Sequence, residues 1–167
     1  MLNLFFRSKQ RREAAARIYA ALVARAREPV FFARFAVPDS LDGRFDLLTL
    51  HVWLVLEHLK GEAQLSQALV DAVFVGFDEA LREMGAGDLG MGRKMKKIAD
   101  AFYGRLKAYG EAEDAAAMAD ALTRNLYRGE AVPCAGAMAA YVLRARQHLA
   151  GWREGEAPDF GPLPGQD

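Results

Sequence analysis

Cysteine, net charge and long apolar runs are the features that this chain of 167 residues has least of. The single cysteine, Cys134, excludes an internal disulfide and any metal site built from several cysteines. The 22 basic and 22 acidic side chains cancel, whereas proteins that bind nucleic acids usually carry a net basic charge, so we expect no nucleic-acid partner. The longest apolar run, Phe45 to Leu59, is shorter than the roughly 20 residues that span a membrane. Because it also contains Asp46 and His51, we expect a buried helix there.

Segments with alternating apolar and polar residues, the pattern of a half-buried β-strand, are also lacking. Apolar residues recur instead at spacings of three and four, which predicts helices over residues 9–27, 40–60, 63–84, 91–109, 112–127 and 133–152. Asp39 or Ser40 is expected to cap the second helix, and Pro133 suits the first turn of the last one. The sequence therefore predicts an all-α fold, a single compact bundle of about six helices over residues 9–152. The acidic segment 153–167, rich in proline and glycine, is expected to be a disordered tail.

Residues 1–8 have two interpretations of equal weight, an N-terminal anchor or a segment packed on the bundle. Their apolar side chains precede a run of cations, the two sets being Leu2, Leu4, Phe5 and Phe6, then Arg7, Lys9, Arg11 and Arg12. This order is typical of a short interfacial helix that makes peripheral contact with an anionic membrane surface. It is also typical of a hydrophobic staple at the start of a helix. The apolar segment is too short and wrongly ordered for a secretory signal, so we expect a cytoplasmic protein.

Three glycines, Gly85, Gly87 and Gly90, have the spacing of a loop that binds dinucleotide phosphates. That loop joins a β-strand to a helix, whereas these glycines join two predicted helices. We therefore expect no nucleotide, and we interpret Gly85 as the left-handed residue that ends a helix. Asp88 is expected to cap the turn or to lie near the positive end of the following helix.

Histidines and carboxylates form no recognisable active site in the sequence. His51 and His58 lie seven residues apart, whereas histidines that bind a metal from one helix are usually four apart, and no third ligand accompanies them. A hydrogen-bonded core histidine is the favoured interpretation of His51. Glu79 and Glu83 lie one turn apart without a nucleophile, which is typical of a solvated helix face. We predict no catalytic residue, no metal and no cofactor.

Two longer blocks carry a resemblance to a known family. The block LREMGAGDLGMGRKMKKIADAFYGR, Leu81 to Arg105, resembles the signature of the ubiquinol–cytochrome c chaperone family, and VPDSLDGRFDLLTLHVWLVLEHLK, Val37 to Lys60, is a second matching block. Ala86 stands where a larger aliphatic residue would be expected, and roughly the last forty residues match nothing in the family. The resemblance implies a helical, non-catalytic protein that assists assembly of the cytochrome bc1 complex and acts on cytochrome b. It also implies a place at the inner face of the bacterial inner membrane or, alternatively, at the matrix side of the mitochondrial one.

The block from Leu81 to Arg105 also holds the candidate client-binding residues. The candidates are four apolar contacts, Met91, Met95, Phe102 and Tyr103, and three rim charges, Lys94, Lys97 and Arg105. Methionine adapts to irregular partners, and cations attract acidic loops or anionic lipid. Such a stripe is also typical of a helix core, so some of the four apolar residues must serve the core instead. The alternative function is a helical haem- or quinone-binding protein, or an enzyme, of the same respiratory pathway.

Overall fold

The computed structural model describes residues 2–153 and 155–166, with side chains from Phe6 onward in these ranges. These residues form seven helices and no strand, which confirms the all-α fold. The helices are α1 (Leu2–Ala26), α2 (Pro29–Ala33), α3 (Leu41–His58), α4 (Ala63–Glu83), α5 (Met91–Gly110), α6 (Ala115–Asn125) and α7 (Ala135–Ala150). Six of them match the predicted segments, and the five-residue α2 lies in the connector that follows α1.

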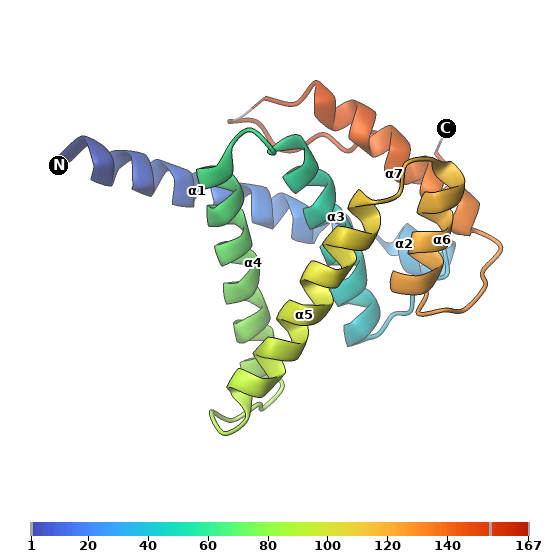
Figure 1. Ribbon diagram of the computed structural model, residues 1–167, viewed down its shortest axis with the longest axis horizontal. Helices are drawn as coiled ribbons and strands as arrows, with labels where there is room; N and C mark the ends of the chain where they lie inside the picture. The colour runs from blue at the N-terminus through green and yellow to red at the C-terminus, as the bar shows by residue number, and fades with distance from the viewer. Residues whose placement is uncertain (1, 154, 167) are drawn as a thin grey trace.

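Helix α3 lies at the centre of the fold and packs against α1, α5 and α7. Helix α4 lies along α1, and α6 packs against both α7 and α5. In Figure 1, α4 and α5 diverge from a shared turn and form a V, with α3 beside its α5 limb. We call residues 63–110, which comprise both helices and their turn, the α4–α5 arm.

The sequence of α3 explains its central place. Apolar side chains surround nearly the whole helix, and its residues from Asp46 to Val55 are almost all fully buried. Ser40 caps the helix as predicted, since its hydroxyl oxygen accepts a hydrogen bond from the Gly43 amide at 3.1 Å. A Cβ at Gly43 would overlap the carbonyl oxygen of Pro38, so the chain can enter this helix only with a glycine at that position.

The turn of the α4–α5 arm is the helix-ending motif expected from its glycines. Gly85 has φ +81°, and its amide donates to the Arg82 carbonyl at 2.9 Å, while the Ala86 amide donates to the Leu81 carbonyl at 3.0 Å. These two bonds satisfy carbonyls that α4 would otherwise leave unpaired. Gly90, at φ +92°, precedes the first residue of α5. The Asp88 carboxylate forms an ion pair with Arg82 at 3.0 Å, so it braces the turn from the side.

The N-terminal segment and the start of α7 differ in detail from expectation. Helix α1 already includes residues 2–8, and its N-terminal half extends away from the other helices (Figure 1). Phe6 is 61% exposed, whereas the side chains of Leu2, Leu4 and Phe5 lie outside the described residues. Pro133 lies two residues before α7 rather than in its first turn.

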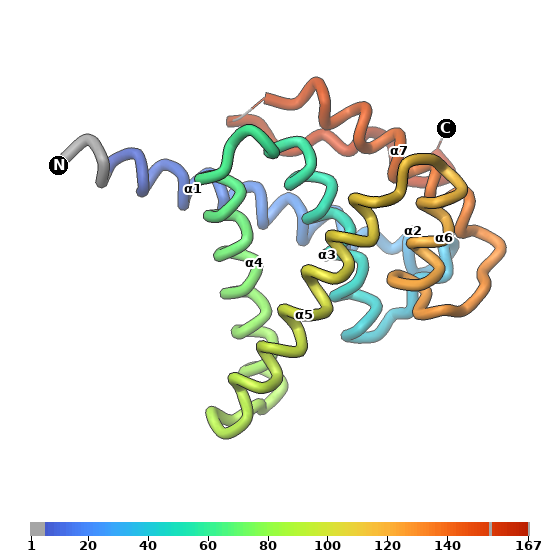
Figure 2. The backbone as a smooth tube through the Cα atoms, viewed as in Figure 1, coloured from blue at the N-terminus to red at the C-terminus, as the bar shows by residue number. Residues whose placement is uncertain are grey.

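The expectation of a disordered tail is corrected over residues 155–166. This segment has no helix or strand, as its proline and glycine content predicts, but it lies against the body of the protein (Figure 2). The Arg25 guanidinium donates to the carbonyl oxygens of Gly161 and Pro162 at 2.9 and 3.0 Å. Phe160 is only 5% exposed and packs edge-on against the His51 ring, with 5.4 Å between centroids. One aromatic anchor and one arginine thus hold a segment whose composition alone suggested disorder.

Candidate functional site

Aromatic side chains hold the two limbs of the α4–α5 arm together near its middle. Phe74 and Phe77 of α4 meet Phe102 of α5 at centroid distances of 5.3 and 6.2 Å. Phe45 of α3 joins them, 5.1 Å from Phe77. Such edge-on and tilted pairs are favourable beyond their buried area. The arm is therefore fixed to α3 at this cluster, while its turn extends away from the body.

Below this cluster, toward the turn, a groove of about 400 Å³ opens between the start of α3, the end of α4 and the start of α5. Its lining is mainly apolar and comprises Leu41, Phe45, Phe77, Ala80, Leu81, Met84, Ile98 and Ala101, with Asp42, Lys97 and Arg128 as the polar members. Leu41 and Met84 are 54% and 51% exposed, which is high for side chains of their size. A second groove of about 430 Å³, between α1, α3 and α4, shares the walls formed by Leu41, Phe45 and Phe77.

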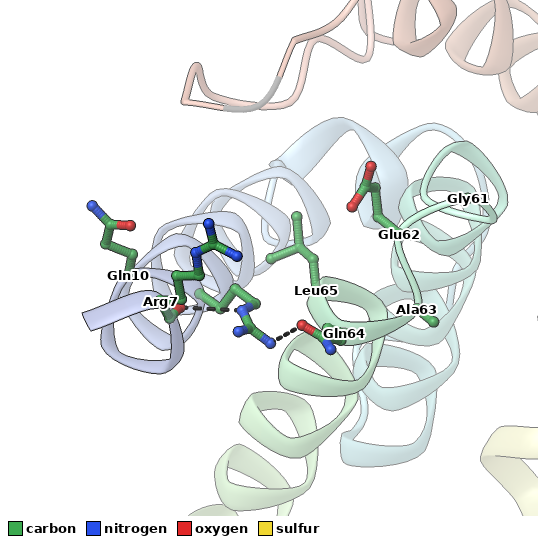
Figure 3. A pocket seen from close by; sticks show the side chains of 8 residues that line it. Arg7, Gln10, Gly61, Glu62, Ala63, Gln64 and Leu65 are labelled. Atoms are coloured by element: carbon green, nitrogen blue, oxygen red, sulfur yellow. Dashed lines mark hydrogen bonds between the residues drawn. The ribbon is translucent and has the colours of Figure 1, made fainter. Parts of the chain in front are cut away.

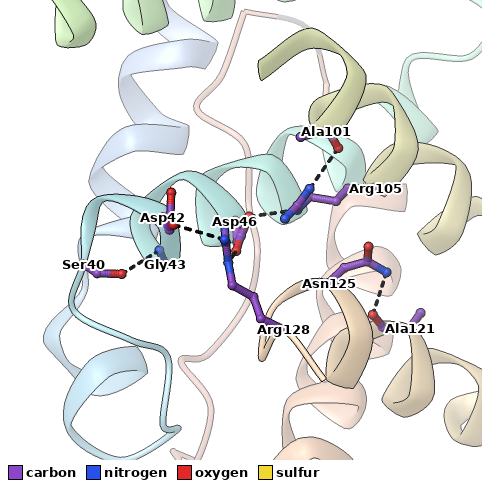
Figure 4. A network of polar contacts seen from close by, with 9 residues as sticks. All are labelled: Ser40, Asp42, Gly43, Asp46, Ala101, Arg105, Ala121, Asn125 and Arg128. Atoms are coloured by element: carbon purple, nitrogen blue, oxygen red, sulfur yellow. Dashed lines mark hydrogen bonds and ion pairs between the residues drawn. The ribbon is translucent and has the colours of Figure 1, made fainter. Parts of the chain in front are cut away.

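A polar network around the buried Asp46 includes Asp42 and Arg128, which line the groove (Figure 4). Asp46 is fully buried, and its carboxylate oxygens pair with Arg105 of α5 and with Arg128 of the α6–α7 loop, both at 2.8 Å. Burial raises the pKa of Asp46, and the two guanidinium groups oppose that rise. Arg128 also pairs with Asp42, at 3.0 Å, on the exposed first turn of α3. The backbone of Arg128 has φ +54°, a conformation that is rare outside glycine and is retained where the surroundings enforce it.

The structure separates the candidate client-binding residues into three groups. Met91 and Phe102 are buried, so they belong to the core. Arg105, expected as a rim charge, is instead mostly buried, and its ion pair with Asp46 helps to offset the cost of that burial. The remaining candidates lie at the surface or partly buried, namely Lys94, Met95, Lys97 and Tyr103. Of all seven, Lys97 alone lines the groove.

Sequence reasoning missed the contributions of α3 and of the loop before α7. Leu41 directly follows the cap of α3, where an exposed leucine was a usable signal of a contact surface. Arg128 had no such signal, because its distance from Asp46 is 82 positions along the chain and only the fold joins them.

His51 is a core histidine, as favoured from the sequence. Its ring nitrogens lie 2.8 Å from the Leu47 carbonyl oxygen and 2.8 Å from the Tyr141 hydroxyl. Burial lowers the pKa of His51 to about 4, so the ring is neutral near pH 7. Both nitrogens are already engaged, and His58 lies on the exposed side of α3 against Trp152. Within the described residues no cluster of three histidine, cysteine or carboxylate side chains could hold a metal ion.

A polar pocket of about 510 Å³ lies between the N-terminal half of α1 and the start of α4 (Figure 3). Arg7, Gln10 and Arg11 of α1 face Glu62 and Gln64 there. The Arg11 guanidinium donates to the Gln64 side-chain oxygen, and its Nε donates to the Arg7 carbonyl oxygen at 3.1 Å. The bond to Gln64 ties the projecting half of α1 to α4. Over the ranges that the structure describes, no helix is long and apolar enough to cross a membrane.

Comparison with known proteins agrees with the fold and with the two sequence blocks. A family model described as ubiquinol-cytochrome C chaperone matches residues 33–155. The expectation that roughly the last forty residues match nothing in the family is therefore wrong as far as residue 155. A crystal structure titled as the Cbp3 homolog from Brucella abortus is 42% identical, with a TM-score of 0.78, and the match covers 92% of this chain and 90% of that one.

Two curated proteins, both named ubiquinol–cytochrome c reductase complex assembly factor 1, are also similar. The one from Xenopus laevis is 29% identical over 119 residues, and the one from Mus musculus is 27% identical over 120 residues. Each match covers 68% of this chain but only 60% and 41%, respectively, of the relative. The family match covers most of the described helices, including both limbs of the α4–α5 arm. The chain therefore belongs to the ubiquinol-cytochrome C chaperone family.

Proposed function

We propose that the protein is a non-catalytic chaperone that binds cytochrome b and assists assembly of ubiquinol–cytochrome c reductase, the bc1 complex. The observation that carries this proposal is the groove of the α4–α5 arm, whose apolar walls reach solvent beside Lys97. An unfinished membrane protein exposes apolar side chains, and a protein that holds it needs apolar surface inside a polar rim. The names of the similar proteins, assembly factors and chaperones, are consistent with this role.

Adaptable side chains in the groove and elsewhere on the α4–α5 arm suit such a client. Met84 is half exposed and Met95 is partly buried, and methionine can repack against irregular partners. Lys94 and Lys97 supply exposed positive charge beside them. A chaperone that binds several conformations of one client benefits from flexible apolar contacts and from a charge that orients the client.

Co-purification with cytochrome b tests this proposal. A tagged protein recovered from detergent-solubilised membranes should carry cytochrome b, detected by immunoblot. In a strain without the gene, native gels should show less assembled bc1 complex, and the wild-type gene should restore its amount. The Lys94→Glu, Lys97→Glu double variant should lose most of both activities, whereas Lys107→Glu, an exposed lysine farther along α5, should keep them. Failure of the wild type to recover any cytochrome b would refute the proposal.

We also propose that the protein works at the inner face of the bacterial inner membrane, with the projecting end of α1 in contact with anionic lipid. Exposed Phe6 and the cations Arg7, Lys9 and Arg12 support this placement, since apolar and basic side chains together favour an interfacial site. Co-sedimentation with vesicles that contain anionic phospholipid should decrease when residues 1–8 are removed. Unchanged sedimentation together with a lower melting temperature would instead assign these residues to packing.

A further inference from the structure

The polar side chains that line the groove of the α4–α5 arm are two cations and one carboxylate, that of Asp42. The cations are Lys97 of α5 and Arg128 of the α6–α7 loop. Among the described residues Lys97 has no acidic partner, whereas its neighbour Lys96 pairs with Asp100 at 3.0 Å. A cation left without a partner beside an apolar groove fits an occupant that is apolar and carries a negative charge.

The two partners of Arg128 differ in a way that makes one of them replaceable. Asp46 is fully buried and pairs with the Arg128 Nε, so this bond holds the arginine in place. Asp42 is 67% exposed and pairs with the outer Nη1, at the mouth of the groove. An exposed pair contributes little to stability, so an incoming carboxylate can take the place of Asp42 at small cost.

On the basis of the proposed function, we infer that the groove binds an amphipathic helical segment of the client. The segment inserts an aliphatic or aromatic side chain between Leu41, Phe77 and Met84. It places a carboxylate on Lys97 and on Arg128, where it displaces Asp42. A cleft between helices that combines apolar walls with a charge at one end is the usual receptor for one face of such a helix. Asp42 then acts as an internal competitor that favours clients bearing the correct acidic residue.

Overlapping 18-residue peptides that tile the cytochrome b of the same organism, each labelled with fluorescein, provide the probe. Fluorescence anisotropy should identify one or a few bound peptides that combine a large apolar residue with Asp or Glu. Asp42→Asn should tighten binding of the best peptide about two- to fivefold, because the competitor is removed. Lys97→Gln should weaken it by a similar factor, and Leu41→Ser by about tenfold or more.

Two matched controls address the surface and the peptide. Val75→Ser removes an equally exposed apolar side chain from α4 outside the groove, and it should leave the affinity unchanged. Conversion of the peptide carboxylate to its amide should weaken binding and abolish the gain from Asp42→Asn. Melting temperatures confirm that each variant is folded.

Several results would overturn the inference. Weaker or unchanged binding in Asp42→Asn would show that this carboxylate does not compete. Equal affinity for acidic and amidated peptides, or displacement of the peptide by vesicles of anionic phospholipid, would assign the groove to another occupant. If Leu41→Ser and Lys97→Gln each recover as much full-length cytochrome b from membranes as the wild type does, the groove is not the contact, although the proposed function stands. If the wild type recovers none, the proposed function itself fails.

Discussion

Around the buried part of α3 from Asp46 to Val55, around α7 and along the C-terminal segment most large side chains are buried, whereas along the α4–α5 arm several apolar side chains reach solvent. In the first region the Tyr141 hydroxyl accepts a hydrogen bond from Arg25 at 3.0 Å and lies 2.8 Å from a ring nitrogen of His51. Tyr141 and His51 are both fully buried. In the arm, Val75, Met84, Leu89 and Tyr103 are each more than half exposed. Apolar surface in the first region stabilises the fold, and apolar surface in the arm is left free for contacts.

This difference indicates that the two regions respond differently to substitution. Changes near α3 leave buried polar groups without partners. Such groups lower the free energy of unfolding, because water satisfies them in the unfolded chain but cannot reach them in the folded protein. Changes at the exposed positions of the arm remove side chains that the folded state scarcely buries. Substitutions in the two regions therefore test this contrast.

Asp46→Ala should cause the largest loss of stability. The substitution leaves Arg105 buried without its carboxylate, and breaking a buried ion pair on one side costs about 3–5 kcal/mol. The free energy of unfolding from urea denaturation measures the loss. Asp42→Ala, which removes the exposed partner of Arg128, should cost no more than about 1 kcal/mol. Equal effects of the two substitutions would contradict the contrast between buried and exposed pairs.

His51 should make stability depend on pH. In the folded protein burial lowers its pKa from 6.5 to about 4, so between these values the unfolded chain binds more protons than the folded one. Stability from this residue is therefore complete above about pH 6.5 and is lost as pH falls toward 4, by about 3 kcal/mol in total.

Carboxylates titrate in the same range, so the informative quantity is the difference between the wild type and His51→Gln. Unfolding free energies measured from pH 7.5 to 4 should decline more steeply in the wild type. Parallel curves would show that His51 is not buried as described.

Gly85→Val should have an intermediate effect, because the arm's turn depends on backbone conformation rather than on packing. A Cβ at Gly85 would meet no atom nearby, so the only cost is the positive φ of +81°. For a β-branched residue that cost is about 1–2 kcal/mol. The melting temperature should fall accordingly, whereas Gly87→Ala, at a glycine without positive φ, should change it little. An unchanged melt of Gly85→Val would mean that the turn differs from the one described.

The sequence predicted the helices and the glycine turn because both depend on local patterns. Apolar spacing marked the helical segments, and Gly85 and Ser40 occupy the end positions expected of them. The groove could not be predicted in the same way, because Leu41, Met84 and Lys97 belong to three helices whose relative placement is set by packing.

Two other misjudgements have the same origin. Arg105 has the periodicity of a surface residue, and only the fold brings Asp46 to it. Composition suggested a disordered tail, yet Phe160 and Arg25 hold the segment in place over a sequence distance that no local pattern records. Residues joined across long distances in the chain were therefore the ones misjudged.

The smallest effect on stability is expected for Met84→Ser, at the turn of the arm, and for Leu41→Ser, at the first residue of α3, which lines the same groove. Both side chains are about half exposed, so each loses little burial, and surface changes of this kind usually alter stability by about 0.5 kcal/mol or less. Recovery of cytochrome b from membranes should nevertheless fall severalfold, because the same side chains form walls of the groove. Val75→Ser, at a similarly exposed position outside the groove, should change neither quantity. If Met84→Ser destabilised the protein by several kcal/mol, its side chain would belong to the core, and the contrast between the two regions would not hold.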